Sequence, residues 1–214
     1  MRTRTLILLA VFLLSLAPAL AQDARHEPSF EEITARAASL KRCKAVDMGL
    51  VAFALQRFPA LGEALAQLAW DPSSAPLQND VGNRMAELML FELAHAAYLC
   101  SIENDKRFGP AWNNIGIIYL ARGEISKAQD AFQRTTQLDP NNAMAFYHLA
   151  MAYDRDNQYD RAIQNYEHAV TLDPRLASVR NNPEVVRNPH QLPLFLRRML
   201  TDQAVRYHLQ ESGE

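Results

Sequence analysis

Residues 112–140 read WNNIGIIYLARGEISKAQDAFQRTTQLDP, and residues 146–174 read FYHLAMAYDRDNQYDRAIQNYEHAVTLDP. The two stretches are 34 positions apart and follow the same pattern, which is conserved between them in residue type more than in residue identity. Aromatic, aliphatic and small side chains recur at the spacing of two helices joined by a turn. Such a unit cannot bury its apolar face alone, so neighbouring copies stack on a common core. The matched residues are Trp112, Ile115, Gly116, Tyr119, Ala128, Phe132 and Pro140, answered by Phe146, Leu149, Ala150, Tyr153, Ala162, Tyr166 and Pro174.

Each unit is predicted to hold two helices, which for the unit 109–142 run over 109–122 and 124–136. Gly123 lies at the corner between them, where a left-handed backbone is inexpensive for glycine. Gly116 and Ala128 are small enough to let the two helices approach closely, and a large side chain at either site is expected to force them apart. Pro140 ends the second helix, because proline cannot continue it and disfavours helical geometry in the residue before it.

A weaker copy precedes these two units over residues 75–108. Val81, Gly82 and Tyr98 match in type, whereas Gln78 replaces the first aromatic residue and Lys106 replaces the proline. One further step back, over 41–74, little beyond Trp70-Asp71-Pro72 stays in register. We therefore expect three repeats, 75–108, 109–142 and 143–176, preceded over 22–74 by helices that can be interpreted as a degenerate repeat.

The pattern W-x-x-I-G-x-x-Y, followed by A-x-x-x-F and P, resembles that of the tetratricopeptide repeat family. The resemblance covers about 100 residues and is most specific over 109–176. It implies an all-α fold, a right-handed solenoid of about three helix pairs with a terminal cap. It also implies that a groove lined by the first helix of each pair holds a peptide or a segment of a partner protein.

Carrying the family pattern over residue by residue predicts which side chains line that groove. Some members of the family clamp a terminal carboxylate with lysines, which are absent from the matching sites here. The asparagines could instead bond to a peptide backbone, and the apolar residues would suit a helix or an extended hydrophobic segment. The alternative is that several of these side chains only pack against the cap or the next repeat. The predicted partner-binding residues are Asn79, Asn83, Asn113, Ile117, Met144, Tyr147, Met151 and Arg155.

The first 21 residues are typical of a cleavable signal peptide. Arg2 and Arg4 precede an apolar run over 6–16, and Ala19-Leu20-Ala21 has the small-x-small form of a cleavage site. The apolar run is shorter than the roughly 20 residues that cross a bilayer, so we expect no membrane span after cleavage. A retained amino-terminal anchor is the alternative. The pattern predicts an exported protein of bacterial type, periplasmic or secreted.

Past Pro174 the repeat pattern fails. Asn181-Asn182-Pro183 and Asn188-Pro189 predict turns, and apolar residues at helical spacing over 193–210 predict an amphipathic helix. We expect 177–214 to form a turn-rich segment and a helix that caps the last repeat, since solenoids need polar ends. A helix for partner docking or self-association, and hence a homo-oligomer, is the other interpretation.

The two cysteines, Cys43 and Cys100, leave two possibilities. In an oxidising compartment they could form a disulfide. Alternatively, they are buried thiols that pack as small hydrophobic side chains.

The sequence contains none of the common motifs for metal binding, catalysis or nucleotide binding. The six histidines form no His-Glu-x-x-His pair or Cys/His cluster, and no nucleophile elbow, phosphate loop or dinucleotide fingerprint occurs. We therefore expect no metal, no cofactor and no enzymatic activity. With 22 basic and 24 acidic residues the formal net charge is −2, which does not favour general binding to nucleic acid.

The sequence thus predicts an exported adaptor that binds a peptide or protein partner and helps to assemble or stabilise an envelope protein complex. The alternative is a structural subunit whose repeats are buried in a larger complex. An enzyme or ligand receptor with an unrecognised site is the third interpretation.

Overall fold

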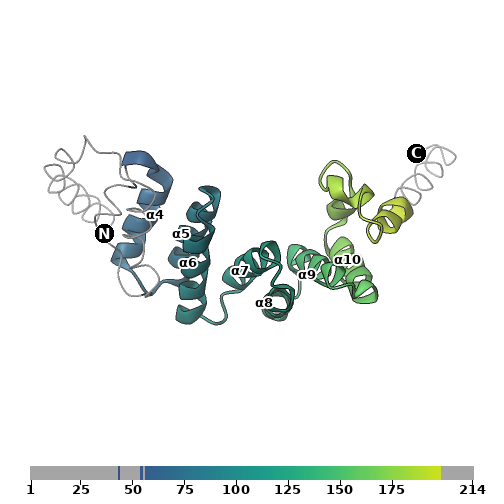
Figure 1. Ribbon diagram of the computed structural model, residues 1–214, viewed down its shortest axis with the longest axis horizontal. Coiled ribbons are helices and arrows are strands. Elements are labelled where there is room, and N and C mark those ends of the chain that lie inside the picture. Colours follow the sequence, from purple (N-terminus) through teal and green to yellow (C-terminus); the bar gives the residue numbers. More distant parts are fainter. Residues whose placement is uncertain (1–42, 44–53, 55, 199–214) are drawn as a thin grey trace, which may run out of the picture. The chain divides into compact units, whose positions relative to one another are not determined.

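The structure is a computed structural model that describes residues 43, 54 and 56–198. Within them the ordered elements are helical and no strand occurs, which confirms the all-α class. The predicted signal peptide and the part of the capping helix beyond residue 198 lie outside the described residues. The elements (Figure 1) are α4 (Pro59–Trp70), α5 (Ala75–Glu87), α6 (Phe91–Asn104), α7 (Gly109–Ala121), α8 (Ile125–Leu138), α9 (Ala143–Arg155), α10 (Tyr159–Leu172) and the 3-10 turns η2 (Pro174–Ala177) and η3 (Pro183–Val186), with residues 192–198 again helical.

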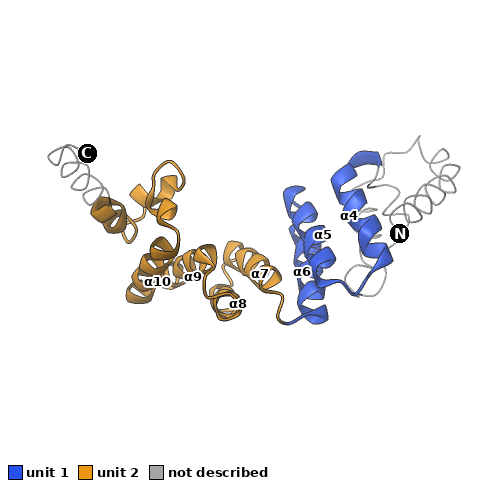
Figure 2. Cartoon of the chain, turned by 180° about the vertical axis from the view of Figure 1, so that it is seen from behind, with its two compact units in different colours: residues 1–106 blue, residues 107–214 orange. Residues whose placement is uncertain are grey.

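The chain forms two compact units, Met1–Lys106 and Arg107–Glu214 (Figure 2). In the first unit α5 packs against both α4 and α6. In the second, α7 pairs with α8 and α9 pairs with α10, while α8 also packs against α9. The pairs α5–α6, α7–α8 and α9–α10 coincide with the three 34-residue stretches of the sequence.

The corner between the paired helices has a left-handed backbone in all three stretches. Gly123, the predicted corner, has φ 74°, and the residues 34 positions before and after it, Met89 and Asn157, have φ 62° and 59°. Glycine adopts this conformation without strain and asparagine tolerates it, whereas for methionine it is uncommon. The same turn is therefore made three times, with the least suitable residue in the first repeat.

Close approach of the paired helices rests on a small residue of the first helix that faces an aromatic ring of the second. A Cβ atom added to Gly116 would lie 2.6 Å from Cε1 of Phe132, and one added to Gly82 would lie 2.4 Å from Cε1 of Tyr98. Phe132 and Ala128 are fully buried in one apolar cluster. The ring of Phe132 is thus the contact that makes glycine necessary at position 116, while Ala128 is the predicted small residue of the second helix.

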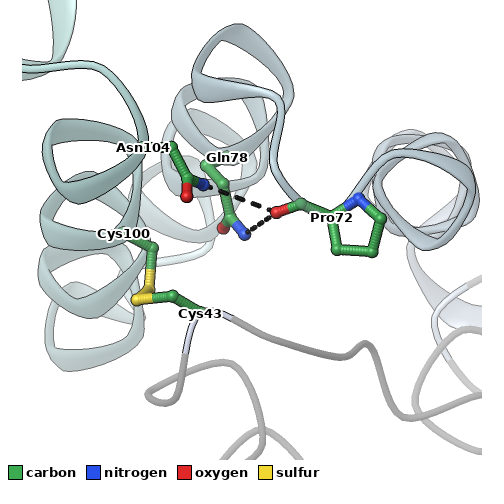
Figure 3. Close-up of a disulfide and its surroundings, with 5 residues drawn as sticks. All are labelled: Cys43, Pro72, Gln78, Cys100 and Asn104. Atoms are coloured by element: carbon green, nitrogen blue, oxygen red, sulfur yellow. Dashed lines mark hydrogen bonds between the residues drawn. A yellow bond between two sulfur atoms is a disulfide. The ribbon is translucent and has the colours of Figure 1, made fainter.

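A disulfide joins Cys43 to Cys100 in the first unit (Figure 3). The two Cα atoms are 5.1 Å apart, and 57 positions separate the residues in the sequence. Beside the bridge, the side-chain amides of Gln78 and Asn104 donate to the carbonyl oxygen of Pro72, at 3.1 and 3.5 Å. These bonds hold the turn before α5 against the end of α6.

Within the described residues, the chain has no helix with the length and apolar character needed to cross a membrane.

Replacing Gly116 by valine is expected to lower the free energy of unfolding by about 2 kcal/mol, because the branched side chain overlaps the buried ring of Phe132. Chemical denaturation measures the loss. The double variant Gly116→Val/Phe132→Leu is the control, since it makes room for the added atoms and should recover part of the stability. If the double variant is less stable than both single variants, the ring is not the obstacle.

Reduction of the disulfide is expected to lower the free energy of unfolding by up to about 4 kcal/mol, because the bridge closes a long loop of the unfolded chain. Urea denaturation with and without a phosphine reductant measures the difference. The variant Cys43→Ala/Cys100→Ala should not respond to the reductant. An equal response of this variant and the unmodified chain would show that the reductant acts elsewhere.

Candidate functional site

The predicted partner-binding residues are divided between the two units. Asn79 and Asn83 lie on α5 in the unit Met1–Lys106, and the other six lie on α7 and α9 in the unit Arg107–Glu214. The second unit therefore brings most of the predicted surface together.

In the first unit the two asparagines serve the fold. Asn79 is only 8% exposed. Asn83 accepts a hydrogen bond of 3.0 Å from the hydroxyl of Tyr98, the residue whose ring covers Gly82. Asn79 is therefore hardly accessible, and the amide oxygen of Asn83 is already bonded within the unit.

In the second unit two hydrogen bonds hold α9 against α7. The amide oxygen of Asn113 lies 2.8 Å from Nδ1 of His148, and because an amide oxygen only accepts, the imidazole donates. At the other end, Nη1 of Arg155 donates to the carbonyl oxygen of Leu120 at 3.0 Å. Each bond joins residues 35 positions apart and connects the first helices of successive repeats. We call the side of α7 and α9 that carries Asn113, Ile117, Met144, Tyr147, Met151 and Arg155 the inner face.

Ile117 and Met144 are the apolar side chains of the inner face that a partner can reach. Ile117 on α7 is 42% exposed and Met144 on α9 is 45% exposed. Met151, in contrast, is half-buried and packs against the core cluster. The accessible apolar area therefore comes from one residue of each helix.

Tyr147 and Asp154, both on α9, contact the segment that follows the last repeat. The hydroxyl oxygen of Tyr147 lies 3.3 Å from Oδ1 of Asn182 and 3.2 Å from Oε1 of Gln191. The carboxylate of Asp154 accepts a 2.6 Å bond from the side-chain amide of Asn188. Tyr147 is thus already engaged at its polar end, which its place in the repeat pattern did not indicate.

His148 was not among the predicted residues, although it belongs to the bond that joins the two inner helices. Its ring lies 5.4 Å from that of Phe132 and 6.2 Å from that of Tyr147, between the core and the inner face. Burial in these surroundings lowers the pKa of His148 to about 4, so the imidazole is neutral at neutral pH. Its position, one residue after the tyrosine of the inner face, is the signal that could have identified it.

The histidines do not form a metal site in the part of the chain that the structure describes. His148 bonds to Asn113, whereas the ring of His168 packs edge-on against Phe146 at 4.2 Å. No group of three potential ligands from His, Cys, Asp and Glu occurs among these residues.

Acidification should weaken the second unit through His148. Its pKa is near 4 in the folded chain and about 6.5 in the unfolded chain, so between these values only the unfolded chain gains the proton. The contribution of His148 to the free energy of unfolding has its full value above pH 6.5. It decreases as the pH drops to 4, by up to about 3 kcal/mol. Denaturation at a series of pH values measures it. His148→Gln retains a donor for Asn113 but does not titrate, so it should lose less stability over this range, and equal losses would contradict the assignment.

Comparison with known proteins identifies the repeat. Models of the tetratricopeptide repeat match residues 109–142 and residues 131–164. Anaphase-promoting complex subunit 3 of Schizosaccharomyces pombe is 29% identical over 90 residues, which are 42% of this chain and 14% of that protein. The chain spans between 9% and 24% of the length of the curated relatives that it matches.

Solved structures show the same fold. A crystal structure of MamA aligns with a TM-score of 0.53 at 21% identity, over 85% of this chain and 92% of that one. A double mutant, MamA RS-1 ArsTM, aligns with a TM-score of 0.55 at 20% identity, over 78% of this chain and 96% of the other. The repeated helix pairs and the matched models identify residues 109–164 as tetratricopeptide repeats.

Proposed function

We propose that this chain is a non-catalytic adaptor that binds a peptide segment of a partner protein on the inner face of α7 and α9. Tetratricopeptide repeats stack into surfaces that bind proteins and peptides, and such scaffolds are typically not enzymes. The observation that carries the proposal is the exposure of Ile117 and Met144 on two helices that hydrogen bonds hold side by side. A preformed surface loses little conformational entropy when it binds.

The chemistry of the inner face favours an apolar segment with hydrogen-bond acceptors. Ile117 and Met144 would contact apolar side chains, and methionine adapts to different shapes. Arg155 is exposed and uses one guanidinium N–H for the carbonyl oxygen of Leu120, so its other donors can reach a carbonyl or carboxylate of the partner. Because α7 and α9 are tied at both ends of this surface, partner binding needs no rearrangement of the two helices.

We further propose that the protein acts outside the cytoplasm, in the assembly or stabilisation of a bacterial envelope complex. The support is the signal-like pattern of residues 1–21 together with the disulfide between Cys43 and Cys100, because disulfides persist in oxidising compartments. Mass spectrometry of the exported form tests this through its amino terminus and its cysteines. A chain that begins at Met1 with two free thiols would contradict it.

Photo-crosslinking in the native cells tests the adaptor. A benzoylphenylalanine placed at Ile117 or at Met144 is expected to form a covalent adduct with the partner, which mass spectrometry identifies. Leu99 on α6, which is exposed to the same extent, is the matched control position and should not give that adduct. The proposed surface would be refuted if all three positions crosslinked to the same protein, or if Ile117 and Met144 gave no adduct.

Truncation of the two exposed side chains gives the quantitative test with the partner so identified. Ile117→Ala/Met144→Ala is expected to weaken binding by roughly 10- to 100-fold, since each removes apolar area that binding would bury. Leu99→Ala should leave the affinity unchanged. Tyr147 and Met151 are poor choices for this test, because both contact the core or the following segment. An affinity of the double variant equal to that of the unmodified chain would exclude Ile117 and Met144 from the contact.

A further inference from the structure

Residues 177–191, which we call the strap, contact α9 at the same sequence spacing at which α9 contacts α7. Asn113 bonds to His148 across 35 positions, and Tyr147 meets Asn182 across 35 positions. Further along the helix, Asp154 bonds to Asn188 across 34 positions. The strap therefore lies against α9 as the first helix of a following repeat would, although it is not an α-helix.

The strap is attached to the unit by few apolar side chains. Its regular structure consists of the end of η2 and of η3, both 3-10 helices, which a turn at 179–181 connects. Ala177 and Val185 are buried, whereas Val179 and Val186 are exposed. A segment with so little apolar burial opens at a lower free energy than the α-helical repeats beside it.

Polar contacts also attach the strap to α9, and several of them meet at Asp154. Its carboxylate accepts from Asn188 and lies 2.5 Å from Nδ1 of His190, while the hydroxyl of Tyr166 donates to it at 3.5 Å. The ring of His190 in turn stacks on Tyr159, with 4.4 Å between centroids. The carboxylate is largely enclosed, so it needs donors such as Asn188 and Tyr166 or equivalent ones.

A second polar group lies at Tyr147. Asn182 and Gln191 are both buried, and the amide nitrogen of Asn182 donates to Oε1 of Gln191 at 3.1 Å. Both side chains lie within hydrogen-bond distance of the Tyr147 hydroxyl. The strap thus places side-chain amides against two polar side chains of α9, Tyr147 of the inner face and the neighbouring Asp154.

From these contacts we infer that the strap is an internal competitor: it occupies the α9 end of the binding surface, and a partner segment with side-chain amides displaces it. The inference rests on the proposed function, because it takes the inner face as the binding surface. It adds the chemistry of the partner, which offers amide N–H groups to Asp154 and a hydrogen-bonding amide to Tyr147. Such a segment replaces each polar contact that the strap gives up, so the exchange leaves no buried carboxylate without donors.

Competition of this kind has a measurable consequence. A binding site that is open in only a fraction of the molecules shows an apparent affinity reduced by that fraction. Loosening the strap without changing α9 must therefore tighten the binding of any segment that takes its place. The sequence of the strap itself is the probe whose chemistry is known.

The experiment measures binding of a fluorescein-labelled synthetic peptide of residues 177–191 to the full chain by fluorescence anisotropy. In the variant Asn182→Ala/Asn188→Ala the tethered strap loses the contact of Asn182 with Tyr147 and the bond of Asn188 to Asp154. The contacts of Gln191 and His190 remain, and α9 itself is unchanged. This variant is expected to bind the peptide at least about tenfold more tightly than the unmodified chain. Adding Asp154→Ala, which removes the acceptor, should abolish the gain. Equal affinity of the strap variant and the unmodified chain would overturn the inference.

Hydrogen exchange separates a displaceable strap from a structural cap. In the strap variant, amides of residues 178–191 should exchange faster while those of α7 to α10 keep their protection. If the amides of α9 and α10 lose protection as well, the strap is part of the core and the inference is wrong. Neither measurement uses the unknown partner. A failure here therefore leaves the adaptor proposal standing, and a failed photo-crosslink leaves the strap result standing.

Discussion

The contact between a small residue of one helix and an aromatic ring of its neighbour determines how closely the paired helices approach. Phe132 fits against Gly116 and Tyr98 against Gly82, with no room for a Cβ between them. In the last pair Ala150 and Tyr166 hold the same positions in the sequence, and both are buried. Because helices that pack this closely fix each other's rotation, this contact decides which side of α7 and α9 is covered and which remains for a partner.

The inner face of the second unit follows from this packing. Once α8 fills the space between α7 and α9, the two inner helices come close enough for Asn113 to bond to His148 and for Arg155 to bond to Leu120. A side chain at the same place in successive repeats therefore need not have the same role. Ile117 is exposed, whereas Met151, one repeat later, packs on the core cluster, which includes Leu194 of the helical segment 192–198.

The repeat pattern was sufficient to predict the helix pairs, their approximate ends and the left-handed corner at Gly123. These features depend on the spacing and size of residues within one repeat, and both can be seen when the sequence is aligned with itself at a period of 34 residues. The environment of Tyr147 and Asp154 could not be predicted in this way. It depends on a segment with two Asn-Pro turns, whose side chains follow no period and whose path is set by contacts with α9. The role of His148 was also missed, since the family pattern assigns inner positions by offset and not by the hydrogen bonds between neighbouring helices.

Both cysteines of the chain lie in its first 106 residues, and the unit Arg107–Glu214 contains none. A change in the redox state of the surroundings can therefore form or break a disulfide in the unit Met1–Lys106 only. The ties between α7 and α9 consist of hydrogen bonds and apolar packing, which a reductant does not break. A change from oxidising to reducing surroundings therefore leaves every covalent bond of the unit that carries the inner face as it was.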